Sequence, residues 1–429
     1  MTYLHRSLSV FGIFVGLVLA GCTNQQSSKQ QGVTASTPTA NSRPAFRVSS
    51  EGANAAEPAI AAGTDGSIYI AWVEHRQKGE ADVMVARYDR QGKSDSPAVR
   101  VNPLAGEACA WAGDPPTIKV GPDESVYVGW TARVGELPAR RATTLYLSAS
   151  RDGGRSFAAP VKVNDDSRPA LHGMYSLAVS ADHRVYLAWL DERNVKQAQT
   201  AGEAGGEHEE GNREVFMAAS TDGGRSFTAN QRVAADVCPC CKTALAVGPD
   251  KRLYLGWRQV LPGDFRHIAV ASSADEGRTF SAPVIVSDDR WQINGCPVSG
   301  PALAVGFGGS LRVVWYTEGE AGERGLYWSE SQDEGRSFAG RKLFFAGQAS
   351  GTPALLNASH GNGMTAVWEM GGESSSHLMT GSVDEAGQVA TRMGALKSEH
   401  PTAAAFEEQR FVAYISTAAE QHEVWLMIL

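Results

Sequence analysis

The feature that most constrains this chain is a repeat that recurs seven times between residues 45 and 429. Each copy has an apolar strand, a turn rich in Gly and Asp, and a second strand with an aromatic end, at Trp72, Trp130, Trp189, Trp257, Trp315, Trp368 and Tyr414. Successive aromatic ends lie 46 to 68 residues apart, which is room for four antiparallel strands and their loops. Such a sheet cannot bury both faces alone, whereas sheets arranged radially bury them against one another. The repeat therefore predicts an all-β fold, a β-propeller of four-stranded antiparallel blades.

The two ends of the repeat region are expected to complete one blade together. Residues 400–429 leave room for only three strands, and residues 45–50 form a short strand without a neighbour in sequence. Pairing these segments would close the ring and remove two exposed strand edges. We therefore expect seven blades closed by an N-terminal strand, with six blades as the alternative.

Four units share a second, eight-residue pattern of the form Ser-x-Asp-x-Gly-x-Ser/Thr-Phe between their third and fourth strands. It occurs at residues 150–157, 220–227, 273–280 and 331–338. The Asp side chain can accept backbone N–H bonds within a hairpin, the Gly can adopt a positive φ, and the Phe can fill the blade. The pattern is thus expected to stabilise the fold.

This pattern resembles the Asp-box, or BNR, repeat of the sialidase superfamily, and weaker copies occur at residues 89–92 and 382–384. The resemblance covers essentially all of residues 45–429. It implies a sialidase-like propeller whose Asp-boxes lie opposite the ligand-binding face. Sialidases have six blades, so the seven units counted here depart from that family.

The N-terminal residues predict export and lipid attachment. Residues 1–21 carry Arg6 and an apolar run from Val10 to Ala20, which is typical of a secretory signal peptide. The run ends in Leu-Ala-Gly-Cys22, which resembles the bacterial lipobox and implies a lipid on Cys22. Residues 22–44 are polar and predict a flexible tether. We expect a lipoprotein of the cell envelope, anchored in the outer membrane and facing the periplasm or the surface; a plain cleaved signal is the alternative.

Charge restricts the partners. The chain has a net charge of −8 and no long basic stretch, so nucleic acid is not expected to bind. The expected partners are the membrane, through the lipid, and a small-molecule, glycan or protein ligand. We expect this ligand on the face where second strands end and first strands begin, named the top face below.

Polar residues follow several second strands and therefore gather at the top face. The sialidase resemblance implies that arginines there hold a carboxylate, that a tyrosine with a glutamate forms the nucleophilic pair, and that an aspartate acts as the acid. Under that resemblance the clamp is Arg76, Arg193 and Arg258, the pair is Tyr316 with Glu318 or Glu369, and the acid is Asp191. The alternative is that charged residues simply mark the places where loops meet water.

Five cysteines beyond Cys22 all lie in loops that enter first strands: Cys109, Cys238, Cys240, Cys241 and Cys296. His172 enters a first strand in the equivalent position. An odd number of cysteines cannot all pair within one exported chain. Thiolates with a histidine suit a soft metal, Cu(I) or Zn(II), so the cluster is a possible metal site. Disulfides among these loops and isolated thiols are the alternatives.

Three functions remain open on the sequence alone. The first is a lipid-anchored ligand-binding or scaffold propeller acting through its top face. The second is an enzyme, an exo-glycosidase of the sialidase type. The third is a periplasmic copper- or redox-handling protein. Propellers support all of these activities, so the fold cannot choose between them.

Overall fold

The computed structural model describes residues 44–429, apart from residues 95, 110–112, 138–139, 196–211, 294, 296, 359–362, 372–375, 385–386, 388 and 419–420. In this part of the chain nearly all regular structure is β-strand. Two 3₁₀ turns, η1 (Gln77–Gly79) and η2 (Phe307–Gly309), accompany the strands. None of the described helical segments is long and apolar enough to cross a membrane.

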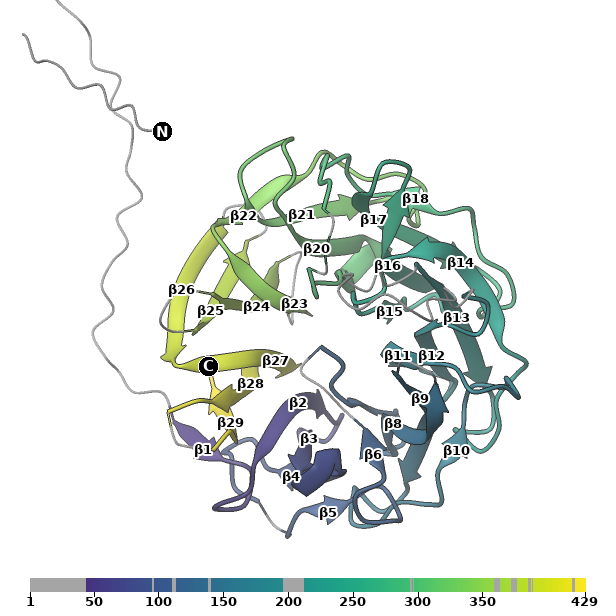
Figure 1. The fold of residues 1–429 in the computed structure, drawn as a ribbon. Coiled ribbons are helices and arrows are strands. Elements are labelled where there is room, and N and C mark those ends of the chain that lie inside the picture. The colour runs from purple at the N-terminus through teal and green to yellow at the C-terminus, as the bar shows by residue number, and fades with distance from the viewer. Residues whose placement is uncertain are drawn as a thin grey trace, which may run out of the picture. The chain divides into compact units, whose positions relative to one another are not determined.

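The strands form antiparallel sheets that surround a common centre (Figure 1). One sheet joins β2 (Ala55–Ala62), β3 (Ile68–His75), β4 (Ala81–Tyr88), β5 (Val99–Arg100), β6 (Ala108–Cys109), β7 (Thr117–Val120), β8 (Val126–Leu137), β9 (Arg140–Ser150) and β10 (Val161–Lys162). The next joins β11 (His172–Val179), β12 (Val185–Asp191), β13 (Arg213–Ser220), β14 (Gln231–Val237), β15 (Ala244–Val247), β16 (Leu253–Leu261), β17 (Phe265–Ser273) and β18 (Val284–Ile285).

Three further sheets have four strands each among the described residues. The first contains β19 (Ala302–Val305), β20 (Leu311–Thr317), β21 (Gly325–Ser331) and β22 (Lys342–Ala346). The second contains β23 (Ala349–Asn357), β24 (Met364–Met370), β25 (His377–Val383) and β26 (Val389–Leu396). The third contains β27 (Ser398–Phe406), β28 (Gln409–Ser416), β29 (Glu423–Ile428) and β1 (Ala45–Arg47). In Figure 1, β2, β11, β15, β23 and β27 lie nearest the centre of the ring.

The first and last strands pair as the sequence predicts. Strand β1 runs antiparallel to β29, with Phe46 opposite Leu426 and Arg47 opposite Trp425. The end of the chain therefore completes its sheet with a strand from the beginning of the region. An all-β fold with four-stranded antiparallel sheets is confirmed, while the number of blades stays a prediction.

Short strands link the four-strand groups within the two larger sheets. Strand β6 pairs with both β4 and β8, and Val237 at the end of β14 pairs with Gln259 of β16. Cys109 belongs to the first link, and Cys238 directly follows the second. Cys109 and Cys238 therefore lie where one four-strand group is joined to the next.

The aromatic ends of the second strands form the core. Among the six tryptophans that end these strands, none is more than 1% exposed. Each packs into an apolar cluster, and the cluster around Trp72 joins β3 to β28 and β29 through Phe411 and Leu426. Burial of this size is worth several kcal/mol per side chain, since truncating a buried tryptophan to alanine costs about 3–5 kcal/mol.

The Asp-box hairpins stabilise the turns between third and fourth strands. In the first, Asp152 Oδ1 accepts the Ser156 N–H at 2.9 Å and Oδ2 accepts the Ser156 hydroxyl at 2.6 Å. The Ser150 hydroxyl donates to Asp152 at 2.7 Å and accepts the N–H of Gly154, whose φ is +81°. The other three hairpins repeat this pattern around Asp222, Asp275 and Asp333. These residues therefore have the structural role that the sequence predicts.

Candidate functional site

Three cysteines gather in the loop between β14 and β15. Cys238 Sγ lies 3.3 Å from Cys241 Sγ and 3.8 Å from Cys240 Sγ, and all three sulfurs lie within 4.8 Å of one another. The exposed fractions are 0% for Cys238 and Cys241 and 3% for Cys240. Cys240 is disulfide-bonded, whereas Cys238 and Cys241 are reduced. Cys296, the fifth predicted member, lies outside the described residues.

Neighbouring charges set the protonation of the sulfur atoms. A hydrogen bond from the Cys241 thiol, helped by the positive charges of Arg258 and Arg266, lowers the pKa of Cys238 to about 6. Burial raises the pKa of Cys241 well above its usual range. Arg266 Nη1 donates directly to Cys238 Sγ at 3.4 Å. The pair therefore favours one thiolate beside one thiol.

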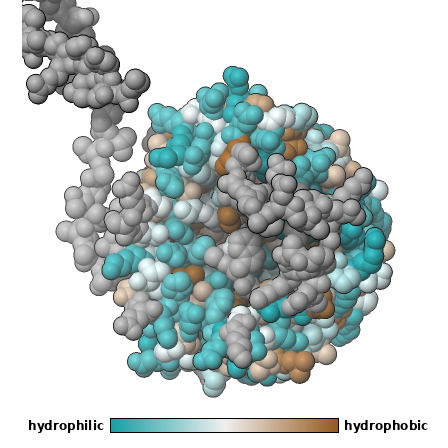
Figure 2. Space-filling model, viewed as in Figure 1, coloured by the Kyte–Doolittle hydropathy of each residue, from teal (hydrophilic) through white to brown (hydrophobic). Residues whose placement is uncertain are grey.

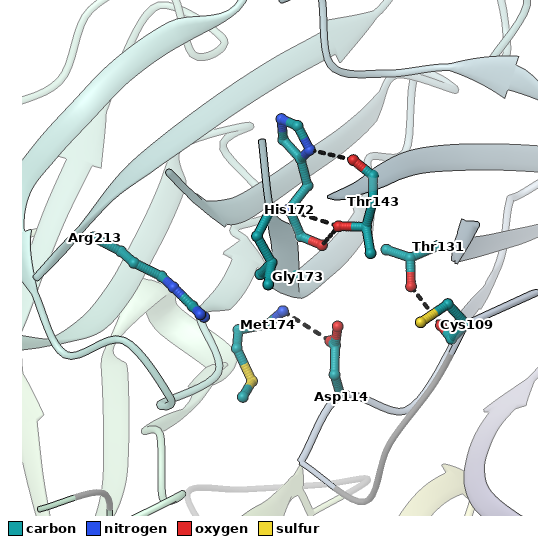
Figure 3. A pocket seen from close by; sticks show the side chains of 9 residues that line it. Cys109, Asp114, Thr131, Thr143, His172, Gly173, Met174 and Arg213 are labelled. Carbon is teal, nitrogen blue, oxygen red and sulfur yellow. Dashed lines mark hydrogen bonds between the residues drawn. The ribbon is translucent and has the colours of Figure 1, made fainter. Parts of the chain in front are cut away.

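A small cavity of about 50 Å³ lies beside this loop, at the entrance to β11. Figure 3 shows Cys109, Asp114 and Arg213 around the same space, next to Met174. Arg213 also donates from Nη1 to the carbonyl of Pro239, inside the cysteine loop. The cavity and the sulfur cluster are thus neighbours joined by one arginine. The cavity therefore has room for water-sized groups beside the buried carboxyl of Asp114.

The sequence analysis missed Asp114, a buried carboxyl group at this cavity that feels the positive charge of the half-buried Lys242. Burial raises the pKa of Asp114 to about 6, although Lys242 and the Met174 N–H, 2.8 Å from Asp114 Oδ1, act against this rise. Burial likewise lowers the pKa of Lys242 to about 8. Asp114 lies in a Gly-Asp-Pro-Pro segment, whose sequence predicts an ordinary turn. No local sequence pattern marks Asp114 as a buried or functional residue.

Cys109 and His172 lie at the cavity and not within the group of three sulfurs. Among the described residues, only Cys238, Cys240 and Cys241 cluster closely enough to share one ion. His172 Nδ1 lies 2.5 Å from the Thr143 carbonyl oxygen, and Nε2 lies 3.1 Å from Asp166 and 3.4 Å from Asp191. Both ring nitrogens therefore face oxygen atoms of the protein. A metal role for His172 or Cys109 stays a prediction.

The arginines of the predicted clamp are bonded to groups within the protein. Arg258 is 0% exposed, and its guanidinium donates to the carbonyls of Ser299 and Tyr316. Arg193 bonds to Asp191 at 2.8 Å and to Asp165 at 2.7 Å. Both arginines therefore already have internal partners, as does Arg76, which bonds to the buried Asp82.

Arg76 is the exposed member of the predicted clamp. It bonds to Asp82 through Nε at 2.6 Å, and it precedes the 3₁₀ turn η1. Arg133, from the end of β8, donates Nη2 to the carbonyl of Gly79 in the same turn at 3.2 Å. Arg133 Nε is buried without a hydrogen-bond acceptor. Two arginines from neighbouring four-strand groups thus meet at one turn of the top face.

The predicted nucleophilic pair is partly assembled. Tyr316 Oη donates to Glu318 Oε1 at 2.5 Å, and the Tyr316 ring packs edge-on against Trp291. Burial, together with that bond to Glu318, raises the pKa of Tyr316. Glu369 instead accepts the Ser376 hydroxyl at 3.0 Å and the His400 N–H at 2.9 Å. Tyr316 is 4% exposed, so its hydroxyl lies inside the protein rather than in an open site.

The predicted acid, Asp191, is fully buried. It is 0% exposed and accepts the Trp189 indole N–H at 2.8 Å as well as two N–H groups of the Arg193 side chain. These donors stabilise the carboxylate and occupy its oxygens. The catalytic roles of Asp191, Tyr316, Glu318 and Glu369 stay predictions.

Comparison with known proteins identifies the class of fold. No family model matches the chain, and no curated protein matches it in sequence. A protein of unknown function from Dyadobacter fermentans matches with 12% identity and a TM-score of 0.52, over 90% of this chain and 98% of its own. A polysaccharide lyase of family PL25, an ulvan lyase bound to -[GlcA(1-4)Rha3S]-, matches with 11% identity and a TM-score of 0.53, over 87% of this chain and 93% of its own.

A third similar structure is the Hadza microbial sialidase Hz136, with 14% identity and a TM-score of 0.50. This match covers 87% of the present chain and 65% of the sialidase. Together these similarities establish a β-propeller-like fold of the kind found in sialidases and polysaccharide lyases. At such low identity the likeness concerns the fold alone.

Proposed function

We propose that this chain is a lipid-anchored protein of the cell envelope that binds acidic glycans on its top face without cleaving them. Its fold is shared with a sialidase and with a lyase whose bound ligand contains glucuronate and a sulfated rhamnose. Both ligand types carry negative groups, which arginines recognise through charge-assisted hydrogen bonds. A chain of net charge −8 needs a local cationic patch for such a ligand.

The observation that carries this proposal is the meeting of Arg76 and Arg133 at Gly79. Arg76 is exposed to solvent although it also bonds to Asp82, and the Nε–H of Arg133 is buried without an acceptor. An acidic group bound across this turn would satisfy that donor and receive a second cation from Arg76. A bidentate contact of this kind suits a carboxylate or a sulfate.

Hydrolysis is not supported equally well, because the groups that it needs are engaged elsewhere. Arg193 and Arg258 are bonded to internal acceptors, and Asp191 is buried beneath Arg193. A glycan on the top face would therefore meet a predicted acid whose carboxylate is already bonded within the protein.

The test is a binding titration with two named probes, 3′-sialyllactose and an oligosaccharide of glucuronate and 3-sulfated rhamnose. We expect saturable binding of at least one probe, weakened about tenfold or more by Arg133→Ala and further by Arg76→Ala, since each charged hydrogen bond is worth about 1.5–3 kcal/mol. Arg225→Ala is the matched control, because Arg225 lies in an Asp-box hairpin at the other end of its strand. No binding of either probe, or equal loss in Arg225→Ala, contradicts the proposal.

A sialidase-type hydrolase is the second candidate, favoured by the 2.5 Å hydrogen bond between Tyr316 and Glu318. Incubation with a fluorogenic sialoside tests it directly. Under this alternative the chain releases the dye, and Tyr316→Phe abolishes the release. Absence of turnover, or turnover that survives Tyr316→Phe, counts against a role for this pair in hydrolysis.

A further inference from the structure

A buried arginine points at the sulfur cluster and has too few acceptors of its own. Arg266 is 7% exposed, its Nη1 lies 3.4 Å from Cys238 Sγ, and its Nε has no hydrogen-bond acceptor. The nearest carboxylate oxygen recorded for it, on Asp264, lies 3.9 Å away on a side chain that is 63% exposed. A guanidinium removed from water requires an anion or a set of acceptors. The anion nearest to this guanidinium is the thiolate of Cys238.

The surroundings of the sulfurs are apolar and closed. Cys238, Cys240 and Cys241 belong to one buried cluster with Met174, Trp257 and neighbouring aliphatic side chains. Because Cys238 and Cys241 are 0% exposed, a partner protein cannot reach either thiol without opening the loop. Disulfide exchange with another protein is therefore disfavoured, whereas a bound ion fits a closed site.

We propose that the thiolates of Cys238 and Cys241 bind one Cu(I) ion in this closed site, beside the sulfur of Cys240. On binding, the S–H bond of Cys241 breaks, the Cys238 thiolate and the new Cys241 thiolate form two Cu–S bonds, and one proton passes to solvent. Copper remains Cu(I), so no electron donor or acceptor is needed. The site goes beyond glycan binding and does not depend on it.

The ligand set favours copper over zinc. Thiolate and thioether sulfurs select soft ions, and the Met174 side chain packs in the same cluster. Structural zinc is almost always four-coordinate. Among the described residues, however, the close group holds the thiols of Cys238 and Cys241, the disulfide-bonded Cys240, and no histidine or carboxylate.

The charges also favour a monovalent ion. Two thiolates around Cu(I) retain one negative charge, which the Arg266 guanidinium can neutralise from 3.4 Å. The same two thiolates around a divalent ion would be neutral, and the buried guanidinium would then lack its anion. Arg258, whose guanidinium donates to three backbone carbonyls, adds positive charge nearby and strengthens this preference.

The experiment is an anaerobic titration of the full chain in detergent with Cu(I), in competition with a chelator that forms a coloured Cu(I) complex. We expect one Cu(I) per chain, not displaced by Zn(II). Cys238→Ser and Cys241→Ser should each weaken binding by more than the roughly 100-fold that loss of an outer-shell partner costs. Arg266→Met should weaken it about 10- to 100-fold, with partial recovery in Arg266→Lys.

Cys109→Ser is the matched control, because Cys109 is reduced and half-buried but lies at the neighbouring cavity. It should bind Cu(I) as the unmodified chain does, and all variants should keep the same affinity for the acidic oligosaccharides. Alkylation of the unmodified chain covers the case in which variants fail to fold. In urea below the unfolding midpoint, where the loop opens transiently, Cu(I) should slow alkylation of Cys238 and Cys241 but not of Cys109. Equal binding by Cys238→Ser, or alkylation of both cysteines at the same rate with and without Cu(I), overturns the proposal.

Discussion

Asp191 offers the sharpest test of whether the polar residues of the top face are structural. Its carboxylate is 0% exposed, accepts the Trp189 indole N–H at 2.8 Å, and binds Arg193 Nη2 at 2.8 Å and Nε at 3.0 Å. His172 Nε2 lies 3.4 Å away. Replacing Asp191 by alanine leaves a buried indole N–H and part of a guanidinium without their acceptor.

The expected loss follows from these contacts. Removing one partner of a buried ion pair costs about 3–5 kcal/mol of folding free energy. Because Arg193 keeps its bonds to Asp165 and Asn230, we expect Asp191→Ala to cost an amount in the lower half of that range. Asp191→Asn keeps the shape and one acceptor oxygen, so it should lose less. Arg232→Ala is the control, since Arg232 is 58% exposed where it pairs with Glu214, and such pairs contribute about 0–1 kcal/mol.

Urea unfolding at pH 7, followed by both tryptophan fluorescence and far-ultraviolet circular dichroism, measures these differences as shifts of the midpoint at constant slope. The predicted order of stability loss is Asp191→Ala, then Asp191→Asn, then Arg232→Ala. A loss below about 1 kcal/mol for Asp191→Ala would refute the reasoning. It would mean that the carboxylate is available for other chemistry.

Two more predictions concern the Asp-boxes and the N-terminus. The hydroxyl of Ser156, with Ser150 and backbone N–H groups, lowers the pKa of Asp152 to about 2, so its contribution to stability is complete above about pH 4 and disappears as the pH falls towards 2. Thermal melting of Asp152→Asn should therefore differ from that of the unmodified chain at pH 5 and converge with it near pH 2; a constant difference contradicts this. The lipid anchor predicts that Cys22→Ser moves the protein from the membrane fraction to the soluble fraction, and a variant that remains in the membrane would contradict it.

The sequence predicts the fold well because the fold depends on local and repeated signals. The tryptophans that end the second strands and the Asp-box turns are each encoded within a few residues. The pairing of β1 with β29 also follows from counting strands, because an incomplete last unit leaves one edge open. The cluster of Cys238, Cys240 and Cys241 is predictable for the same reason, since four consecutive residues hold it.

The state of the charged residues is not predictable in this way. Arg76 and Arg193 follow second strands, whereas Arg258 lies within β16, and only Arg76 of the three is exposed. The difference arises from acceptors distant in sequence, such as the Ser299 carbonyl 41 residues after Arg258. Likewise, burial raises the pKa of Asp114, and the positive charge that opposes this rise comes from Lys242, which is distant in sequence.

Isothermal titration calorimetry of the unmodified chain with the oligosaccharide of glucuronate and 3-sulfated rhamnose tests the central claim most directly. One instrument separates binding from turnover, because binding gives heat pulses that saturate and catalysis gives a sustained heat flow. The account predicts a saturating isotherm, no sustained heat, and intact glycan recovered afterwards. Sustained heat flow with shortened oligosaccharide, or no heat at any ratio, would contradict it.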